Sequence, residues 1–130
     1  MVRDVALKFY EMYNTHTVDL LDALLTSTYI GHINEQDIYG RAAAKAVIGY
    51  FLAAFPDVQY TVEDTVVSGA KVVARWTATA THQGVFAGLE PTHKPVTMTG
   101  ITIFRIQEAQ ISELWDSWDI FGLLQQLQAA

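Results

Sequence analysis

The stretch VTMTGITIFRIQEAQISELWDSWDIFGLLQQL (96–127) decides the fold, because apolar and polar residues alternate over most of its length. A period of two is typical of half-buried β-strands and predicts strands over 96–106 and 111–118, joined by the turn QEAQ. The end of the stretch changes to helical spacing and predicts a short helix over 120–127. Just upstream, 57–67 and 72–82 alternate in the same way around the turn SGAK. We therefore expect four antiparallel strands in a meander, closed by a helix.

The first part of the chain has helical spacing instead. Apolar residues recur on one face over 2–13 and again over 17–25, where Thr17 is the expected N-cap. A third helix is expected from about Arg41, and Pro56 ends it. Between the second and third helices, 27–40 is predicted to be a polar connection. Helices followed by strands predict an α+β fold in a single domain over 1–130, with the helices on one face of a curved antiparallel sheet that encloses a pocket.

Composition narrows the classes of function. Of the 130 residues, 51% are hydrophobic, the net charge is −6, and the eight Lys and Arg form no cluster. A nucleic-acid partner is not expected, because binding phosphates requires a basic face. The longest apolar run, 46–55, is too short to span a membrane, and the charged start is unlike a signal peptide. A cytoplasmic protein is therefore expected. The chain has no Cys, which excludes disulfides and cysteine metal sites but does not fix the compartment.

Strand alternation separates the two acids of WDSWD (115–119). A type I turn with a bulge at 107–109, with Ala109 left-handed, would pair Gly100 with Asp116 and Thr102 with Leu114. Asp116 then points to the inner face. A plain two-residue loop would instead pair Asp116 with Ile101. Asp119 has the other parity and directly precedes the last helix, where a carboxylate is a good N-cap. We expect Asp116 to be the candidate for chemistry and Asp119 to be structural.

A carboxyl group among apolar side chains has a raised pKa and can exchange protons near neutral pH. His82, on the inner face of its strand, could orient a substrate carbonyl or share a proton. The alternatives are structural: a buried Asp116 satisfied by Tyr13 or a Trp indole, and a hydrogen-bonded core His82. His32 is expected to line the pocket mouth or face water. No phosphate-binding loop, metal-ligand spacing or nucleophile elbow is present.

The order of elements resembles the cone-shaped nuclear-transport-factor-2-like fold. The segment THQGVFAGLEPTHKPVTMTGITIFRIQEAQISELWDSWDIFGLLQQL (81–127) is similar to the SnoaL-like polyketide cyclases, and YNT (13–15) matches their first helix. The sequence departs from the family at Gly100 and Thr102, where the cyclases carry Gln and His. It also lacks their pocket Asn near Gly31 and His32.

The resemblance implies that Asp116 is the general acid/base of an intramolecular aldol condensation on a hydrophobic carbonyl or ester substrate, with His82 as a second catalytic residue. It implies no metal, no cofactor and a homodimer formed through the sheet. An isomerase, a dehydratase, an epoxide hydrolase and a non-catalytic ligand-binding or dimerisation module stay open as alternatives. The residues expected to contact the substrate are Tyr13, His32, Phe51, Trp76, Phe86, Met98, Gly100, Thr102, Leu114 and Trp118.

Overall fold

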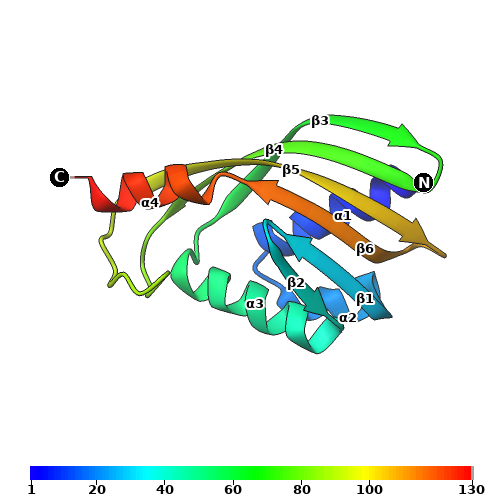
Figure 1. Cartoon of the computed structure of the whole chain (residues 1–130), viewed down its shortest axis with the longest axis horizontal. Helices are drawn as coiled ribbons and strands as arrows, with labels where there is room; N and C mark the ends of the chain where they lie inside the picture. Colours follow the sequence, from blue (N-terminus) through cyan, green and yellow to red (C-terminus); the bar gives the residue numbers. More distant parts are fainter. Residues whose placement is uncertain (130) are drawn as a thin grey trace.

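The computed structural model describes residues 1–129, which form helices packed on one six-stranded sheet (Figure 1). The elements in chain order are α1 (Val2–Asn14), η1 (Val18–Leu20), α2 (Leu21–Leu24), β1 (Leu25–Ile33), β2 (Gln36–Tyr39), α3 (Arg41–Ala54), β3 (Gln59–Ser68), β4 (Lys71–Thr81), β5 (Pro95–Gln107), β6 (Gln110–Trp118) and α4 (Ile120–Gln128). The α+β class expected from the sequence is confirmed.

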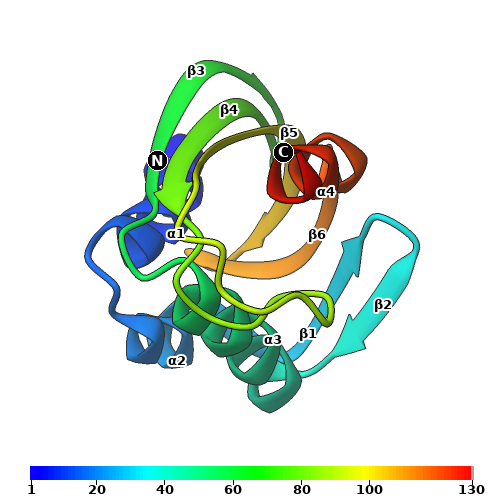
Figure 2. The same ribbon diagram turned by 90° about the vertical axis from the view of Figure 1, so that its left-hand side faces the viewer.

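The sheet has the strand order β2-β1-β6-β5-β4-β3 and is not closed. Figure 2 shows β3 to β6 curving around one side of the molecule, with α1 and α3 lying across the concave side. The four strands of the predicted meander and the closing helix all form close to their predicted bounds. Alternation could locate these strands because one face of β4, β5 and β6 is buried in the core and one face of β3 is partly buried against it.

The concave face and the two long helices enclose the core. On β4, Val72, Ala74, Trp76 and Ala78 are all buried, as the predicted inner face requires. The other side of the core is formed by apolar residues spaced along α1 and α3. Helix α3 ends at Ala54, because the proline at position 56 cannot continue it. No helix in residues 1–129 is long and apolar enough to cross a membrane.

The prediction of a polar connection over 27–40 was wrong. Most of this segment lies in β1 and β2, an antiparallel hairpin that turns at Asn34 and Glu35. Strand β1 also pairs with β6 in parallel, so the sheet is mixed and not wholly antiparallel. The sequence signal was weak, because β2 is short and β1 obtains its pairing from a strand far along the chain. That long-range pairing overrides the local polar composition.

The second predicted helix is also shorter than expected. A single 3-10 turn and four α-helical residues replace the predicted 17–25, and Leu25 already belongs to β1. The side chain of Thr17 makes no capping bond to the helix and donates to the Thr15 carbonyl instead. Helical spacing could not reveal this early stop, because Leu24 and Leu25 are buried in either conformation.

The β5–β6 hairpin has a different register from the predicted one but keeps the predicted faces. Glu108 and Ala109 both have positive φ and form a two-residue turn that pairs Gln107 with Gln110. A bulge two residues later places Thr102 opposite Asp116 and Gly100 opposite Trp118, a shift of two from the prediction. Because the shift is even, Asp116 still faces the concave side. The left-handed Ala109 is as predicted.

Asp119 acts as the expected cap. It is the N-cap of α4, and its Oδ1 accepts a hydrogen bond from the Gly122 backbone N–H at 2.8 Å. The two acids therefore lie in different places although they are three positions apart. Asp119 caps α4, whereas Asp116 lies on β6 and faces the concave side of the sheet.

Candidate functional site

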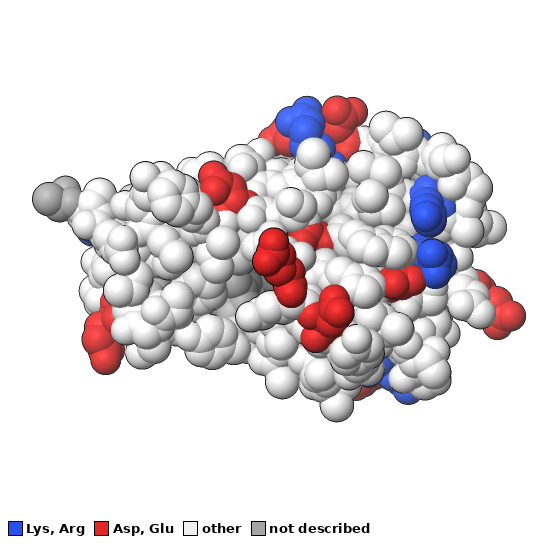
Figure 3. All heavy atoms as spheres, in the orientation of Figure 1, with Lys and Arg blue, Asp and Glu red and all other residues white. Residues whose placement is uncertain are grey.

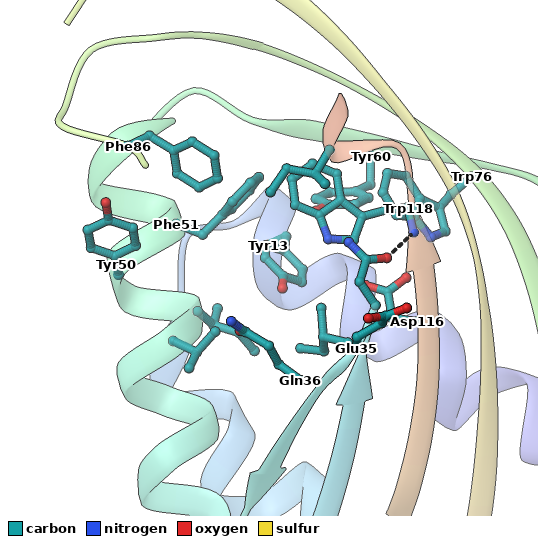
Figure 4. A pocket seen from close by; sticks show the side chains of 15 residues that line it. Tyr13, Glu35, Gln36, Tyr50, Phe51, Tyr60, Trp76, Phe86, Asp116 and Trp118 are labelled. Atoms are coloured by element: carbon teal, nitrogen blue, oxygen red, sulfur yellow. Dashed lines mark hydrogen bonds between the residues drawn. The ribbon is translucent and has the colours of Figure 1, made fainter. Parts of the chain in front are cut away.

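A cavity of about 460 Å³ opens between the concave face of the sheet, α1 and α3 (Figure 4). This volume falls in the range typical of small-molecule sites. Its walls are mostly aromatic and aliphatic. The lining residues are Tyr13, Ile33, Asn34, Glu35, Gln36, Val47, Ile48, Tyr50, Phe51, Tyr60, Trp76, Phe86, Asp116, Trp118 and Ile120.

Asp116 is the acid in the inner wall of this cavity. Strand β6 presents it on the concave face, and it also borders a smaller hollow beside Leu114. It keeps some accessible surface, which faces these hollows. Burial of the carboxyl group raises its pKa from 3.8 to about 6, and a hydrogen bond from Thr102 partly opposes that rise. A carboxyl group with this pKa can accept and return a proton near neutral pH.

Two hydrogen bonds in series hold the Asp116 carboxylate on the side of the neighbouring strands β5 and β4. Trp76 Nε1 donates to Thr102 Oγ1 at 3.0 Å, and Thr102 Oγ1 donates to Asp116 Oδ1 at 2.9 Å. Because the indole N–H can only donate, the single hydroxyl proton of Thr102 is directed to the carboxylate. The anticipated Trp indole does support Asp116, but it does so through Thr102. Oδ2 has no hydrogen-bond partner among residues 1–129 and is free to act.

The turn of the β1–β2 hairpin is fastened to β6 on both sides of this acid. The Asn34 backbone N–H donates to the Asp116 carbonyl at 2.7 Å, and Asn34 Oδ1 accepts from the Trp118 backbone N–H at 3.0 Å. The hairpin therefore fixes the strand segment that carries Asp116 and forms one wall of the cavity.

Five of the residues predicted to contact the substrate line the cavity, namely Tyr13, Phe51, Trp76, Phe86 and Trp118. Four others lie around it without lining it. Thr102 and Leu114 are buried beside Asp116, Gly100 is covered by the Trp76 ring, and Met98 is part of the core. Gly100 and Met98 therefore support the wall rather than contact its contents.

The placement of His82 does not match the prediction of a residue next to the acid. It follows Ala74 by eight residues, and Ala74 pairs with Thr102 in the row that contains Asp116. At about 3.3 Å per residue, His82 lies roughly 25 Å farther along the strand. Its Nδ1 bonds to Thr92 and its ring packs on Phe55. This is the alternative of a hydrogen-bonded core histidine.

His32 lies outside the cavity. Its partner on β6 is Trp115, so it shares the convex face with that residue, and the two rings stack at 5.6 Å. Its Nδ1 and Nε2 lie 2.7 Å from Asp37 and 2.6 Å from Glu113. These two carboxylates raise the pKa of His32. Of the two positions expected for His32, at the pocket mouth or facing water, the structure does not give the mouth, because alternation along β1 turns its side chain to the convex face.

Several lining residues were not identified from the sequence. The hairpin turn contributes three polar residues at the mouth, Asn34, Glu35 and Gln36, and β3 contributes Tyr60. Tyr60 lies on a predicted strand and could have been found from its parity. The three turn residues could not have been found from the sequence, because the hairpin that carries them was not predicted. The other missed lining residues are Ile33, Val47, Ile48, Tyr50 and Ile120.

Charge in the lining is entirely negative, with Glu35 at the mouth and Asp116 inside, and no Lys, Arg or His among the described lining residues. Figure 3 shows acidic and basic side chains scattered over this face of the molecule, without a broad basic area. Within residues 1–129, no group of three or more His, Cys, Asp or Glu could hold a metal ion. The charged group in the inner wall of the cavity is therefore a carboxyl group in mostly apolar surroundings.

Comparison with known proteins places this chain in a family. The sequence profile of the SnoaL-like polyketide cyclases matches residues 3–127. The chain belongs to the SnoaL-like polyketide cyclase family. No curated protein sequence matches it. The resemblance seen in the sequence is confirmed, and the nuclear-transport-factor-2-like fold goes with it.

Solved structures agree with the family assignment. A candidate SnoaL-like polyketide cyclase from Jannaschia sp. CCS1 superposes with a TM-score of 0.91 at 20% identity, covering 99% of this chain and 92% of its own. IdmH from Streptomyces antibioticus, a candidate polyketide cyclase, gives 0.86 at 28% identity, covering 98% of each chain. AclR from Streptomyces galilaeus, a candidate hydroxylase, gives 0.89 at 24% identity, covering 99% of this chain and 96% of its own. The similarities to the Jannaschia protein and to AclR show a shared fold only, because both sequence identities are low.

Proposed function

We propose that this protein catalyses an intramolecular aldol-type cyclisation of a hydrophobic carbonyl or ester substrate, with Asp116 as the general acid/base. The observation that carries the proposal is a single carboxyl group with a pKa of about 6 in the wall of an aromatic cavity. Family membership supports the reaction class. The absence of a basic residue from the described lining favours substrates whose acid groups are neutralised, for example as esters.

The reaction needs one proton to move out and back. Oδ2 of the ionised Asp116 removes a proton from the carbon next to a substrate carbonyl, and the C–H electron pair becomes an enolate. The enolate carbon attacks a second carbonyl carbon of the same molecule, and a C–C bond forms while the C=O π pair moves to oxygen. The alkoxide takes the proton back from Asp116. Nothing is oxidised or reduced, and no group is lost.

The test is turnover of a polyketide methyl ester by wild type, Asp116→Asn and Asp119→Asn. Asn keeps the shape of Asp116 but cannot act as a base, so kcat should fall by about 10² to 10⁴. Asp119→Asn is the matched control, because Asn also caps a helix, and its kcat should be unchanged. Undiminished turnover by Asp116→Asn would rule out the proposed mechanism.

A second candidate is a different proton-transfer reaction at the same acid, such as isomerisation, dehydration or epoxide opening. Gly100 and Thr102 favour it, because they occupy positions where the resembling cyclases carry Gln and His. A panel of apolar ketones, epoxides and esters separates the two candidates. A protein that binds panel members without converting any of them would instead be a non-catalytic binding module.

We also propose that the protein forms a homodimer through the convex face of the sheet. An apolar row crosses four strands there, formed by Val66, Val73, Ile103 and Trp115 in register, and Ile101 in the next row is about half exposed. Light scattering at micromolar concentration should give twice the chain mass, and Ile101→Glu should give a monomer. A monomeric wild type would contradict this proposal.

A further inference from the structure

Two tyrosines of the cavity pack their rings against neighbouring aromatic residues but make no hydrogen bond to any described residue with their hydroxyls. Tyr13, near the end of α1, and Tyr60, near the start of β3, both line the cavity, and their rings lie 4.7 Å apart. Neither hydroxyl has a hydrogen-bond partner among residues 1–129. The third tyrosine of the lining differs, because the Tyr50 hydroxyl accepts a bond from the Ala87 backbone N–H at 3.1 Å. Tyr13 and Tyr60 are both partly buried, and their hydroxyls belong to a cavity whose wall is mostly apolar. A hydroxyl without a partner in such surroundings is costly, so two in one cavity indicate that its occupant provides the acceptor.

Both phenols stay protonated at the pH values at which a protein operates. Burial raises the pKa of Tyr13 and of Tyr60 well above 10, and the negative charge of Asp116 adds to the rise in both. They are therefore donors of hydrogen bonds and cannot compete with Asp116 as bases. The same charge effect shows that both hydroxyls lie within electrostatic reach of the carboxylate. Figure 4 shows the two side chains facing the space that Asp116 borders.

We propose that Tyr13 and Tyr60 together form the oxyanion-binding half of the site and donate hydrogen bonds to the oxygen of the enolate that Asp116 generates. This inference rests on the proposed function. When Asp116 takes the proton, its negative charge moves to the substrate oxygen, and the lining offers no cation to receive it. Neutral donors fixed in an apolar wall stabilise such a charge more than water does, because they need not reorient.

Other donors belong to the same wall, namely the side-chain amides of Asn34 and Gln36, the Tyr50 hydroxyl and the indole of Trp118. The indole N–H of Trp118 also has no partner among residues 1–129, whereas that of Trp76 is taken by Thr102. Trp118 is half-buried, and its backbone is fixed by Asn34. The phenols are the better candidates, because there are two of them from different elements and their rings lie 4.7 Å apart in the same wall. A test must still separate them from the indole.

The test uses 2-naphthol, a planar phenol whose oxyanion resembles an enolate, and the Asp116→Asn protein, which has no charge at position 116. We expect bound naphthol to ionise at a lower pH than free naphthol, measured by the absorption band of naphtholate, which reports ionisation in the ground state. In this background, Tyr13→Phe and Tyr60→Phe should each weaken naphtholate binding about tenfold or more, since hydrogen bonds to charged groups are strong. Tyr39→Phe is the control, because Tyr39 is exposed on β2 and does not line the cavity, and it should change nothing.

Naphthalene, which has no oxygen, serves as the control for shape, and its affinity should be the same in all variants. The inference is overturned if naphtholate affinity is unchanged in both phenol variants, if naphthalene binding falls equally, or if only Trp118→Phe lowers naphtholate affinity. None of these readouts needs turnover. If naphtholate binding depends on the phenols while no carbonyl substrate is converted, the oxyanion site stands and the proposed reaction fails. If a carbonyl substrate is converted but naphtholate binding does not depend on the phenols, the proposed reaction stands and the oxyanion site fails.

Discussion

At the scale of single residues, Asp116 and Asp119 show how position decides what a carboxylate does. Asp119 receives a backbone N–H at the start of α4, whereas Asp116 is surrounded by apolar and aromatic side chains. Sequence parity was enough to separate them, because side chains on a strand alternate while a residue before a helix caps it. The role of Thr102 could not be read in the same way. Its role depends on the register of the β5–β6 hairpin, and the predicted register differs from the observed one by two residues.

Thr102 should control the pKa of Asp116. In Thr102→Val the ionised carboxylate loses a hydrogen bond, so its pKa should rise by about one unit, and Thr102→Ser should restore it. The pH–rate profile should shift upward by the same amount while its plateau at high pH is kept, since a more basic carboxylate is still ionised there. A lower plateau without any shift would mean that Thr102 only supports the fold. The loss of a partner for Trp76 should also lower stability by about 1–3 kcal/mol.

At the scale of elements, the sequence predicted well where local pattern and burial agree. Strands β3 to β6 and helices α1, α3 and α4 formed near their expected bounds, because each has one face that is buried or, on β3, partly buried. The β1–β2 hairpin was missed because its stability comes from parallel pairing with β6, which no local pattern records. The missed hairpin explains the incomplete site, since its turn provides one wall. It also explains why the position of His32 on the convex face was not predicted.

Two glycines provide a matched test of how the sheet supports the cavity wall. A Cβ added at Gly100 on β5 would meet the Trp76 ring and lie 2.8 Å from Trp118 Cβ, whereas one added at Gly49 on α3 meets nothing within 4 Å. Gly100→Ala should therefore destabilise the protein by about 2 kcal/mol, as overpacking does. Gly49→Ala should stabilise it by about 1 kcal/mol through higher helix propensity. Urea unfolding measures both, and equal effects would contradict the packing described for Trp76 and Trp118.

At the scale of the whole molecule, a mixed sheet wraps around a cavity whose inner wall carries Asp116 in apolar surroundings. Burial of the ionised carboxylate lowers the stability of the folded state. The pKa of Asp116 is about 6 in the folded protein and 3.8 as its ordinary value, so the folded state binds the proton more tightly. The stability that this proton provides is fully present below pH 3.8 and is lost as the pH rises through 6.

Asp116→Asn should therefore be more stable than wild type at pH 8, by about 2 kcal/mol, and the difference should shrink at pH 4.5. Urea unfolding of both proteins at the two pH values measures it, and effects of acid common to both cancel in the difference. A variant that is less stable than wild type at pH 8 would show that the ionised carboxylate stabilises the fold, contrary to this account.

The most direct test of the central claim is the titration of the Asp116 carboxyl carbon by NMR in the ligand-free protein. Burial in the cavity wall predicts a midpoint near pH 6, which would make Asp116 half-ionised close to neutrality. A midpoint near 3.8, the ordinary value for an aspartate, would mean that water reaches the carboxylate freely. Asp116 would then be no better suited to accept a proton than an acid on the surface.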